Sequence, residues 1–114
     1  MYKISEFAEW TGLTKETLRY YAEVQLLEPA YINPDNNYRY YDDGSYFLAI
    51  LLVKLRAFGF TIQEMISVMN DESFESLEVL LQEKRNNIQM QMESLQLKMD
   101  EIDGFLTSGK EEDE

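Results

Sequence analysis

A long stretch without helix breakers occupies the second half of this chain. From Phe74 to Leu106 there is no proline, and the first glycine is Gly104. Apolar residues recur here with alternating spacings of four and three, which is the pattern of a coiled-coil seam. The seam residues are Leu81, Ile88, Met92, Leu95, Met99, Ile102 and Leu106. Residues 74–106 are therefore predicted to form one long helix.

The seam of this predicted helix needs a partner. A single helix in water cannot bury such a stripe, because most helical stability in proteins comes from packing of the apolar face. The seam therefore implies a second chain, although a helix folded back on its own domain is an alternative. Arg85 interrupts the seam, so pairing is expected to loosen or change partner there. The spacing alone does not distinguish a parallel from an antiparallel pair.

The first half of the chain contains one three-residue sequence twice, as Arg19-Tyr20-Tyr21 and as Arg39-Tyr40-Tyr41. A guanidinium donates a bidentate pair of hydrogen bonds to phosphate oxygens, and a tyrosine hydroxyl adds one directional bond. The repeated sequence therefore indicates a surface that binds the phosphate backbone of DNA.

The first copy lies in the second of two short predicted helices. Ser5 is expected to cap the first helix, and Gly12 to end it in the left-handed conformation. Thr14 is the predicted N-cap of the second helix, with Leu18 and Tyr21 on its buried face. This arrangement is typical of a helix-turn-helix, although any small helical hairpin has the same outline.

The second copy follows a predicted turn. Residues 30–32 and 38–41 are strand-like and rich in tyrosine, and residues 33–37 between them are turn-forming. This pattern predicts a β-hairpin, the wing of a winged helix-turn-helix. A half-buried strand pair without a binding role is the alternative. Tyr38 and Arg39 lie beside the turn, where a wing would reach a phosphate backbone.

Two further helices are predicted before residue 70. Asp42 or Asp43 can cap the first, which is expected to end at Phe58-Gly59. Thr61 and Glu64 form a capping box at the start of the second. The predicted apolar face of the first helix consists of Phe47, Leu48, Leu51, Leu52 and Leu55.

These patterns together predict a mainly α-helical chain with a small β-hairpin wing. Residues 1–70 are expected to form a winged helix-turn-helix that binds DNA, and residues 74–106 a coiled-coil dimerisation helix. Residues 107–114 are polar and acidic, and they are predicted to form a disordered tail.

The composition argues against several other classes of protein. The chain has no cysteine and no histidine, which removes disulfides, thiolate or imidazole metal sites and the commonest general base. No pair of carboxylates stands out at a catalytic spacing, so we expect no enzyme, no cofactor and no metal. The sequence shows neither a membrane span nor a signal-peptide core, so a cytoplasmic location is expected.

The net charge of −12 opposes the prediction of DNA binding, because nucleic-acid binders usually carry a basic surface. Residues 1–70 carry 6 basic and 9 acidic side chains, whereas residues 71–114 carry 4 and 13. Most of the acidity therefore lies outside the predicted binding unit. We expect weaker non-specific binding and greater reliance on the placement of individual charges.

Six motifs in register resemble those of the MerR family of bacterial transcription regulators. They are Tyr2-Lys3-Ile4-Ser5-Glu6-Phe7-Ala8, Thr11-Gly12-Leu13-Thr14, Thr17-Leu18-Arg19-Tyr20-Tyr21, Leu26-Leu27-Glu28-Pro29, Tyr38-Arg39-Tyr40-Tyr41 and Leu55-Arg56-Ala57-Phe58-Gly59-Phe60-Thr61. The resemblance implies an antiparallel coiled-coil homodimer that binds a pseudo-palindromic double-stranded promoter. It also implies bending and undertwisting of the DNA, so that RNA polymerase engages a promoter whose spacer is too long.

The resemblance also implies which residues contact DNA. The second helix of the helix-turn-helix would be the recognition helix, and residues at its start would reach base edges. Residues further along this helix and in the wing would bind the DNA backbone. The base-edge candidates are Thr14, Lys15 and Thr17, and the backbone candidates are Arg19, Tyr20, Tyr38, Arg39 and Arg56. Family members usually carry an effector domain or a cysteine-bearing loop after the coiled coil. This chain is then either the DNA-binding portion of a longer regulator or a short member without its own sensor.

Two other functions stay open at the level of sequence. An architectural or excisionase-like factor would bend DNA without recruiting polymerase. An acidic helical interaction module would have kept the fold and lost its DNA affinity, a possibility that the net charge of −12 favours.

Overall fold

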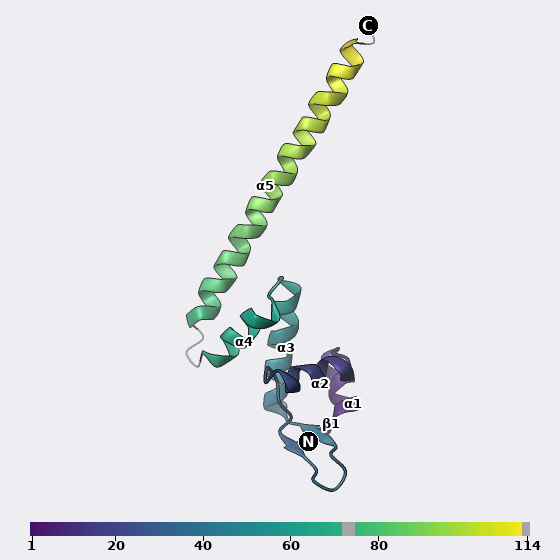
Figure 1. The fold of residues 1–114 in the computed structure, drawn as a ribbon, viewed down its shortest axis with the longest axis vertical. Helices are drawn as coiled ribbons and strands as arrows, with labels where there is room; N and C mark the ends of the chain where they lie inside the picture. The colour runs from purple at the N-terminus through teal and green to yellow at the C-terminus, as the bar shows by residue number, and fades with distance from the viewer. Residues whose placement is uncertain (72–74, 113–114) are drawn as a thin grey trace. The chain divides into compact units, whose positions relative to one another are not determined.

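The computed structural model describes residues 1–71 and 75–112, with side chains up to residue 109. The chain divides into two compact units, Met1–Ser76 and Leu77–Glu114. Figure 1 shows the elements of both. In chain order they are β1 (Tyr2–Lys3), α1 (Ile4–Thr11), α2 (Lys15–Glu23), β2 (Tyr31–Ile32), β3 (Arg39–Tyr41), α3 (Asp43–Ala57), α4 (Ile62–Asn70) and α5 (Glu75–Glu112).

The predicted helix-turn-helix is present as α1 and α2. Gly12 ends α1 with a φ of 82°, and its amide donates to the carbonyl of Ala8. Thr14 caps α2, because its hydroxyl oxygen accepts the amide of Thr17 at 3.0 Å. The prediction that Ser5 caps α1 is wrong. The helix begins at Ile4, immediately after the extended residue Lys3, so Ser5 lies inside its first turn.

The predicted wing is confirmed, and it belongs to a sheet of three antiparallel strands in the order β1-β3-β2. Tyr31 pairs with Tyr40 across the hairpin, and Tyr2 pairs with Tyr41 on the other side of β3. The hairpin turn is closed by the amide of Asn37, which donates to the carbonyl of residue 33 and has a φ of 60°. Strand β1 therefore attaches the start of the chain to the wing.

The predicted caps of α3 and α4 are also confirmed. The carboxylate of Asp42 accepts the amide of Ser45 at 2.8 Å at the start of α3. At the start of α4, Thr61 and Glu64 accept each other's backbone amides. Gly59 lies between the two helices in the left-handed conformation, with a φ of 95°.

The predicted apolar face of α3 is partly wrong. Phe47 is 72% exposed and Leu48 is also exposed, whereas Leu52 and Leu55 are buried as expected. The core-facing stripe instead begins with small side chains at Ser45 and Ala49. Small residues on that stripe let the first half of α3 approach the domain closely, which turns the larger neighbours outward.

The core of the first unit draws on every helix of that unit and on the central strand. Its largest fully buried side chains are Tyr41, Phe7, Phe60, Leu18, Leu52, Leu55, Met65 and Val68. Because α2 and β3 both insert a side chain into this core, the recognition helix and the wing are held by the same packed interior.

Helix α5 forms nearly all of the second unit. Its predicted start, Phe74, lies outside the described residues. The helix extends to Glu112, so residues 107–112 are helical where the sequence predicted a tail. A helix lengthens at little cost once nucleated, and the hydroxyl of Thr107 donates to the carbonyl of Asp103 within it. Residues 113–114 are not described.

Six of the seven seam residues of α5 are exposed in the isolated chain, and Leu81 is half-buried. Ile88 and Leu95 are 48% and 58% exposed, and Met92, Met99, Ile102 and Leu106 are similarly open. In the part of the chain that the structure describes, no helix is both long and apolar enough to span a membrane.

Candidate nucleic-acid interface

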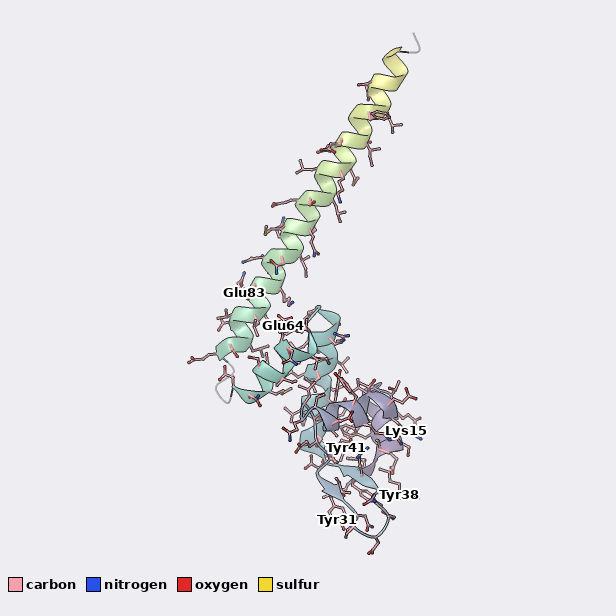
Figure 2. The ribbon with its side chains drawn as sticks, viewed as in Figure 1. Lys15, Tyr31, Tyr38, Tyr41, Glu64 and Glu83 are labelled. Atoms are coloured by element: carbon pink, nitrogen blue, oxygen red, sulfur yellow. The ribbon has the colours of Figure 1, made fainter. Side chains whose placement is uncertain are left out.

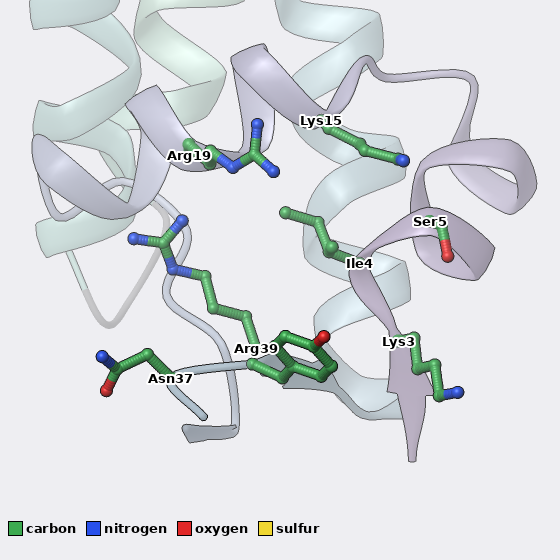
Figure 3. A pocket seen from close by; sticks show the side chains of 8 residues that line it. Lys3, Ile4, Ser5, Lys15, Arg19, Asn37 and Arg39 are labelled. Atoms are coloured by element: carbon green, nitrogen blue, oxygen red, sulfur yellow. The ribbon is translucent and has the colours of Figure 1, made fainter. Parts of the chain in front are cut away.

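A cleft of about 370 Å³ opens between helix α2, the first residues of the chain and the wing. Figure 3 shows this cleft and its lining side chains. They are Lys3, Ile4, Ser5, Lys15, Arg19, Asn37, Tyr38 and Arg39. Four of the predicted DNA contacts, namely Lys15, Arg19, Tyr38 and Arg39, therefore meet at one site although two elements supply them.

The cleft concentrates positive charge in an acidic chain. Lys3, Lys15, Arg19 and Arg39 are four of the six basic residues in positions 1–70, and none of the described residues that line the cleft is acidic. Figure 3 shows Lys15 and Arg19 entering from α2, while the guanidinium of Arg39 reaches toward Arg19 from the wing. The placement of these charges offsets, locally, the net charge of −12.

A second cleft of about 480 Å³ adjoins the first. Arg19 and Arg39 line both clefts, so the two guanidiniums form the boundary between them. The second cleft also includes Glu23 and Glu28. A phosphate would be attracted to the basic cleft and repelled from the carboxylates beside it, which confines the anion-binding surface to one side of the arginines.

Two threonine side chains at the start of α2 are held in place by hydrogen bonds to each other and to the backbone. The hydroxyl of Thr14 donates to that of Thr17 at 2.8 Å, while its oxygen also accepts the amide of Thr17. The cap therefore fixes both side chains at the end of the helix where the macrodipole favours an anion. Lys15 is exposed beside them. These three residues are the ones that the sequence predicted to face base edges.

Two of the predicted tyrosines are open to solvent. Tyr20 lies on α2 and Tyr38 precedes β3, and both are exposed. In Figure 2, Tyr31 and Tyr38 lie on the hairpin, whereas Tyr41 lies inside the first unit. An exposed tyrosine ring can pack against a sugar of the DNA while its hydroxyl reaches a phosphate.

Arg56 stands apart from the other predicted contacts. It lines neither cleft described above, and its Nη1 donates to the carbonyl of Phe60 at 3.2 Å. Burial raises the pKa of the nearby Tyr21, and the charge of Arg56 opposes that rise. Arg56 thus closes the turn after α3, a role that its position in the sequence did not indicate.

Four cleft residues were missed by the sequence analysis, namely Lys3, Ile4, Ser5 and Asn37. Lys3 reaches the site because it pairs with Tyr40 across β1 and β3, and nothing local to residues 2–3 predicts that pairing. The scarcity of basic residues in positions 1–70 was an available signal, since a DNA-binding surface would need most of them.

Comparison with known proteins identifies the family. The model for "MerR HTH family regulatory protein" matches residues 2–72, which is more than half of the chain. The chain belongs to the MerR family. Residues 2–72 are the DNA-binding domain of a MerR-family transcriptional regulator, as the resemblance predicted.

Curated MerR-family relatives match beyond the winged domain. The multidrug-efflux transporter 1 regulator of Bacillus subtilis is 31% identical over 94 residues, covering 82% of this chain and 34% of that protein. The transcriptional regulator CueR of Escherichia coli is 33% identical over 98 residues, covering 82% of this chain and 72% of CueR. The chain therefore spans about a third of the first of these relatives.

Solved structures of MerR regulators share the fold. The N-terminal part of the Bacillus subtilis multidrug transporter activator, MtaN, superposes with a TM-score of 0.81 at 22% identity, over 93% of this chain and 98% of that one. The EcmrR–DNA complex in EcmrR-RPo superposes with a TM-score of 0.72 at 31% identity, over 98% of this chain and 41% of EcmrR. These matches confirm a winged helix-turn-helix followed by a long helix.

Proposed function

We propose that this chain binds a pseudo-palindromic promoter as a homodimer and regulates transcription by distorting the DNA. The observation that carries the proposal is the shared cleft of Arg19 and Arg39, where the recognition helix, the wing and β1 together bring four basic side chains to one site. Two guanidiniums from separate elements can clamp one stretch of phosphate backbone, which fixes the register of the protein on the duplex.

Docking follows from the geometry of this clamp. With α2 in the major groove, its first turn faces the bases and the wing follows the adjacent backbone. We assign base-edge contacts to Thr14, Lys15 and Thr17, and backbone contacts to Arg19, Tyr20, Tyr38 and Arg39. EcmrR, which was solved in complex with DNA, is 31% identical to this chain over 98% of this chain, and this likeness supports binding of DNA.

The exposed stripe on α5 supports the dimer. An apolar seam of this length is stabilised when a second copy covers it, and the family resemblance favours an antiparallel pair. Two winged domains joined in this way would contact two half-sites of one promoter, acting with RNA polymerase there. Such a protein works where the chromosome is, in the cytoplasm. The relatives are transcription regulators, and we assign the chain no catalytic activity.

Selection of bound duplexes from a random pool at low salt tests the proposal. The expected result is enrichment of an inverted repeat, bound with an affinity that falls steeply as salt rises. Absence of enrichment, with the protein folded and dimeric, would favour the acidic interaction module instead.

A bending assay and transcription from a promoter with a long spacer then separate a regulator from an architectural factor. A regulator of the proposed kind bends the selected duplex and changes transcript level. An architectural factor bends the same duplex and leaves transcription unchanged.

A further inference from the structure

The hydroxyl of Tyr41 is a buried polar group without a partner. The side chain is fully buried in the first unit, and its hydroxyl oxygen has no hydrogen bond to any residue that the structure describes. Buried hydroxyls in folded proteins are nearly always hydrogen-bonded, because an unpaired one opposes folding. The Tyr41 hydroxyl therefore needs an explanation beyond the stability of the free protein.

Packing does not explain it. The ring of Tyr41 stacks on Phe7, with centroids 4.4 Å apart and planes 9° apart. Phenylalanine would provide the same ring at this position without burying an oxygen. Packing of the ring therefore explains why residue 41 is aromatic, but it does not explain why the side chain carries a hydroxyl.

The surroundings of the hydroxyl point to the basic cleft. Tyr41 and Arg39 are two residues apart in β3, so their side chains lie on the same face of the strand. Arg39 in turn shares both clefts with Arg19. Burial raises the pKa of Tyr41, and the charges of Arg39 and Arg19 oppose the rise. Because Arg39 lines the cleft and shares a face of β3 with Tyr41, it is the cleft residue that we expect to reach this hydroxyl.

We propose that Tyr41 is a positioning residue for Arg39 in the DNA complex. In this arrangement the Tyr41 hydroxyl oxygen accepts one guanidinium N–H of Arg39 while other N–H groups of Arg39 bind a phosphate. A guanidinium carries five N–H donors in a rigid fork, and a bidentate phosphate contact uses two of them. The inference rests on the proposed function, because it takes DNA to be the source of the phosphate.

The hydroxyl gains its partner when the cleft is filled. In the free protein Arg39 is partly exposed, so water can satisfy its donors. A phosphate backbone over the cleft would displace that water and leave Arg39 to bond to the phosphate and to the protein. A fixed acceptor beneath the guanidinium then restricts its orientation, which strengthens a bidentate contact.

Tyr41→Phe tests the inference, because it removes the oxygen and keeps the stacked ring. Tyr40→Phe is the matched control, since Tyr40 is the neighbouring residue on the opposite face of β3, packed near Tyr31. The measurements are the melting temperature and the Kd for the selected duplex over a range of salt concentrations. For Tyr41→Phe we expect a melting temperature no lower than that of the wild type and a Kd about tenfold higher, as for loss of one hydrogen bond to a charged group. Tyr40→Phe should bind as the wild type does.

A double-mutant cycle tests whether the change in Kd caused by Tyr41→Phe depends on Arg39. If the hydroxyl acts through Arg39, Tyr41→Phe should have no further effect on Kd in an Arg39→Ala background. An equal loss in both backgrounds would overturn the inference, as would wild-type affinity for Tyr41→Phe. A lowered melting temperature for Tyr41→Phe would also overturn it, because the hydroxyl would then serve the free fold. Failure of the wild type itself to select any duplex would instead overturn the proposed function.

Discussion

The hydroxyl of Tyr2 donates a hydrogen bond to the carboxylate of Asp43 at 2.9 Å, joining β1 to the first residue of α3. The ring of Tyr2 also lies 4.8 Å from that of Trp10 on α1, and Trp10 stacks on Tyr46 of α3 at 3.9 Å. The first two elements of the chain, β1 and α1, thus meet the distant helix α3 in one aromatic cluster. The cluster holds β1 against α1 and α3, and the pairing of β1 with β3 keeps Lys3 at the edge of the basic cleft.

Tyr2→Phe should therefore give a pH-dependent loss of stability. The hydrogen bond to Asp43 raises the pKa of Tyr2 above its ordinary value of 10.0. A raised folded-state pKa means that the stabilisation is fully present below pH 10 and is lost as the pH rises through the folded-state value. The difference in melting temperature between wild type and variant should be constant near neutral pH and shrink above pH 10. A difference that grows at alkaline pH would contradict the assigned bond.

Local signals in the sequence predicted most of the element boundaries. Gly12, Thr14, Thr61 and Glu64 each act on backbone groups within four residues, so their roles follow from residue type and spacing alone. The turn at residues 33–37 was predictable for the same reason. These features needed no knowledge of the rest of the fold.

Features that depend on distant residues were not predictable in this way. Strand β1 has two residues, and only its pairing with β3 makes it a strand. The exposure of Phe47 follows from the close approach of Ser45 and Ala49 to the core, which a count of apolar residues does not show. For the site, the sequence indicated the paired arginines, whereas the carbonyl partner of Arg56 appears only in the folded chain.

Arg39→Ala should weaken binding to all DNA duplexes, whatever their base sequence. A phosphate contact contributes through counterion release, so its loss lowers the slope of log K against log salt by about 1. The measurement is a titration of the selected duplex and of an unrelated duplex at several salt concentrations. We expect a similar loss of affinity for both. Glu28→Gln, in the adjoining second cleft, is the matched control and should not lower the slope. An unchanged slope for Arg39→Ala would remove Arg39 from the phosphate contacts.

Arg56→Ala should lower the stability of the fold and leave the salt dependence of DNA binding unchanged. Its hydrogen bond to the carbonyl of Phe60 is partly exposed, so we expect a loss of about 1 kcal/mol in the free energy of unfolding. The salt slope of DNA binding should stay that of the wild type, because Arg56 does not line the basic cleft. Urea denaturation and the same salt titration measure the two effects. A slope reduced by about 1 would restore Arg56 to the phosphate contacts predicted from the sequence.

The seam of α5 predicts how the dimer can be broken. Ile88→Lys with Leu95→Lys places two charges in the proposed interface, where burial without partners is costly, so the dimer should dissociate. Met90→Lys with Leu97→Lys is the matched control. Those two residues are 65% and 64% exposed, and each follows a seam residue by two positions, about 200° around the helix.

Sedimentation should show a monomer for the seam variant and a dimer for the control variant. DNA affinity should fall only for the first, because its two half-sites are no longer bound together. A seam variant that stays dimeric would contradict the coiled-coil assignment, and a control variant that dissociates would place the interface on another face of α5.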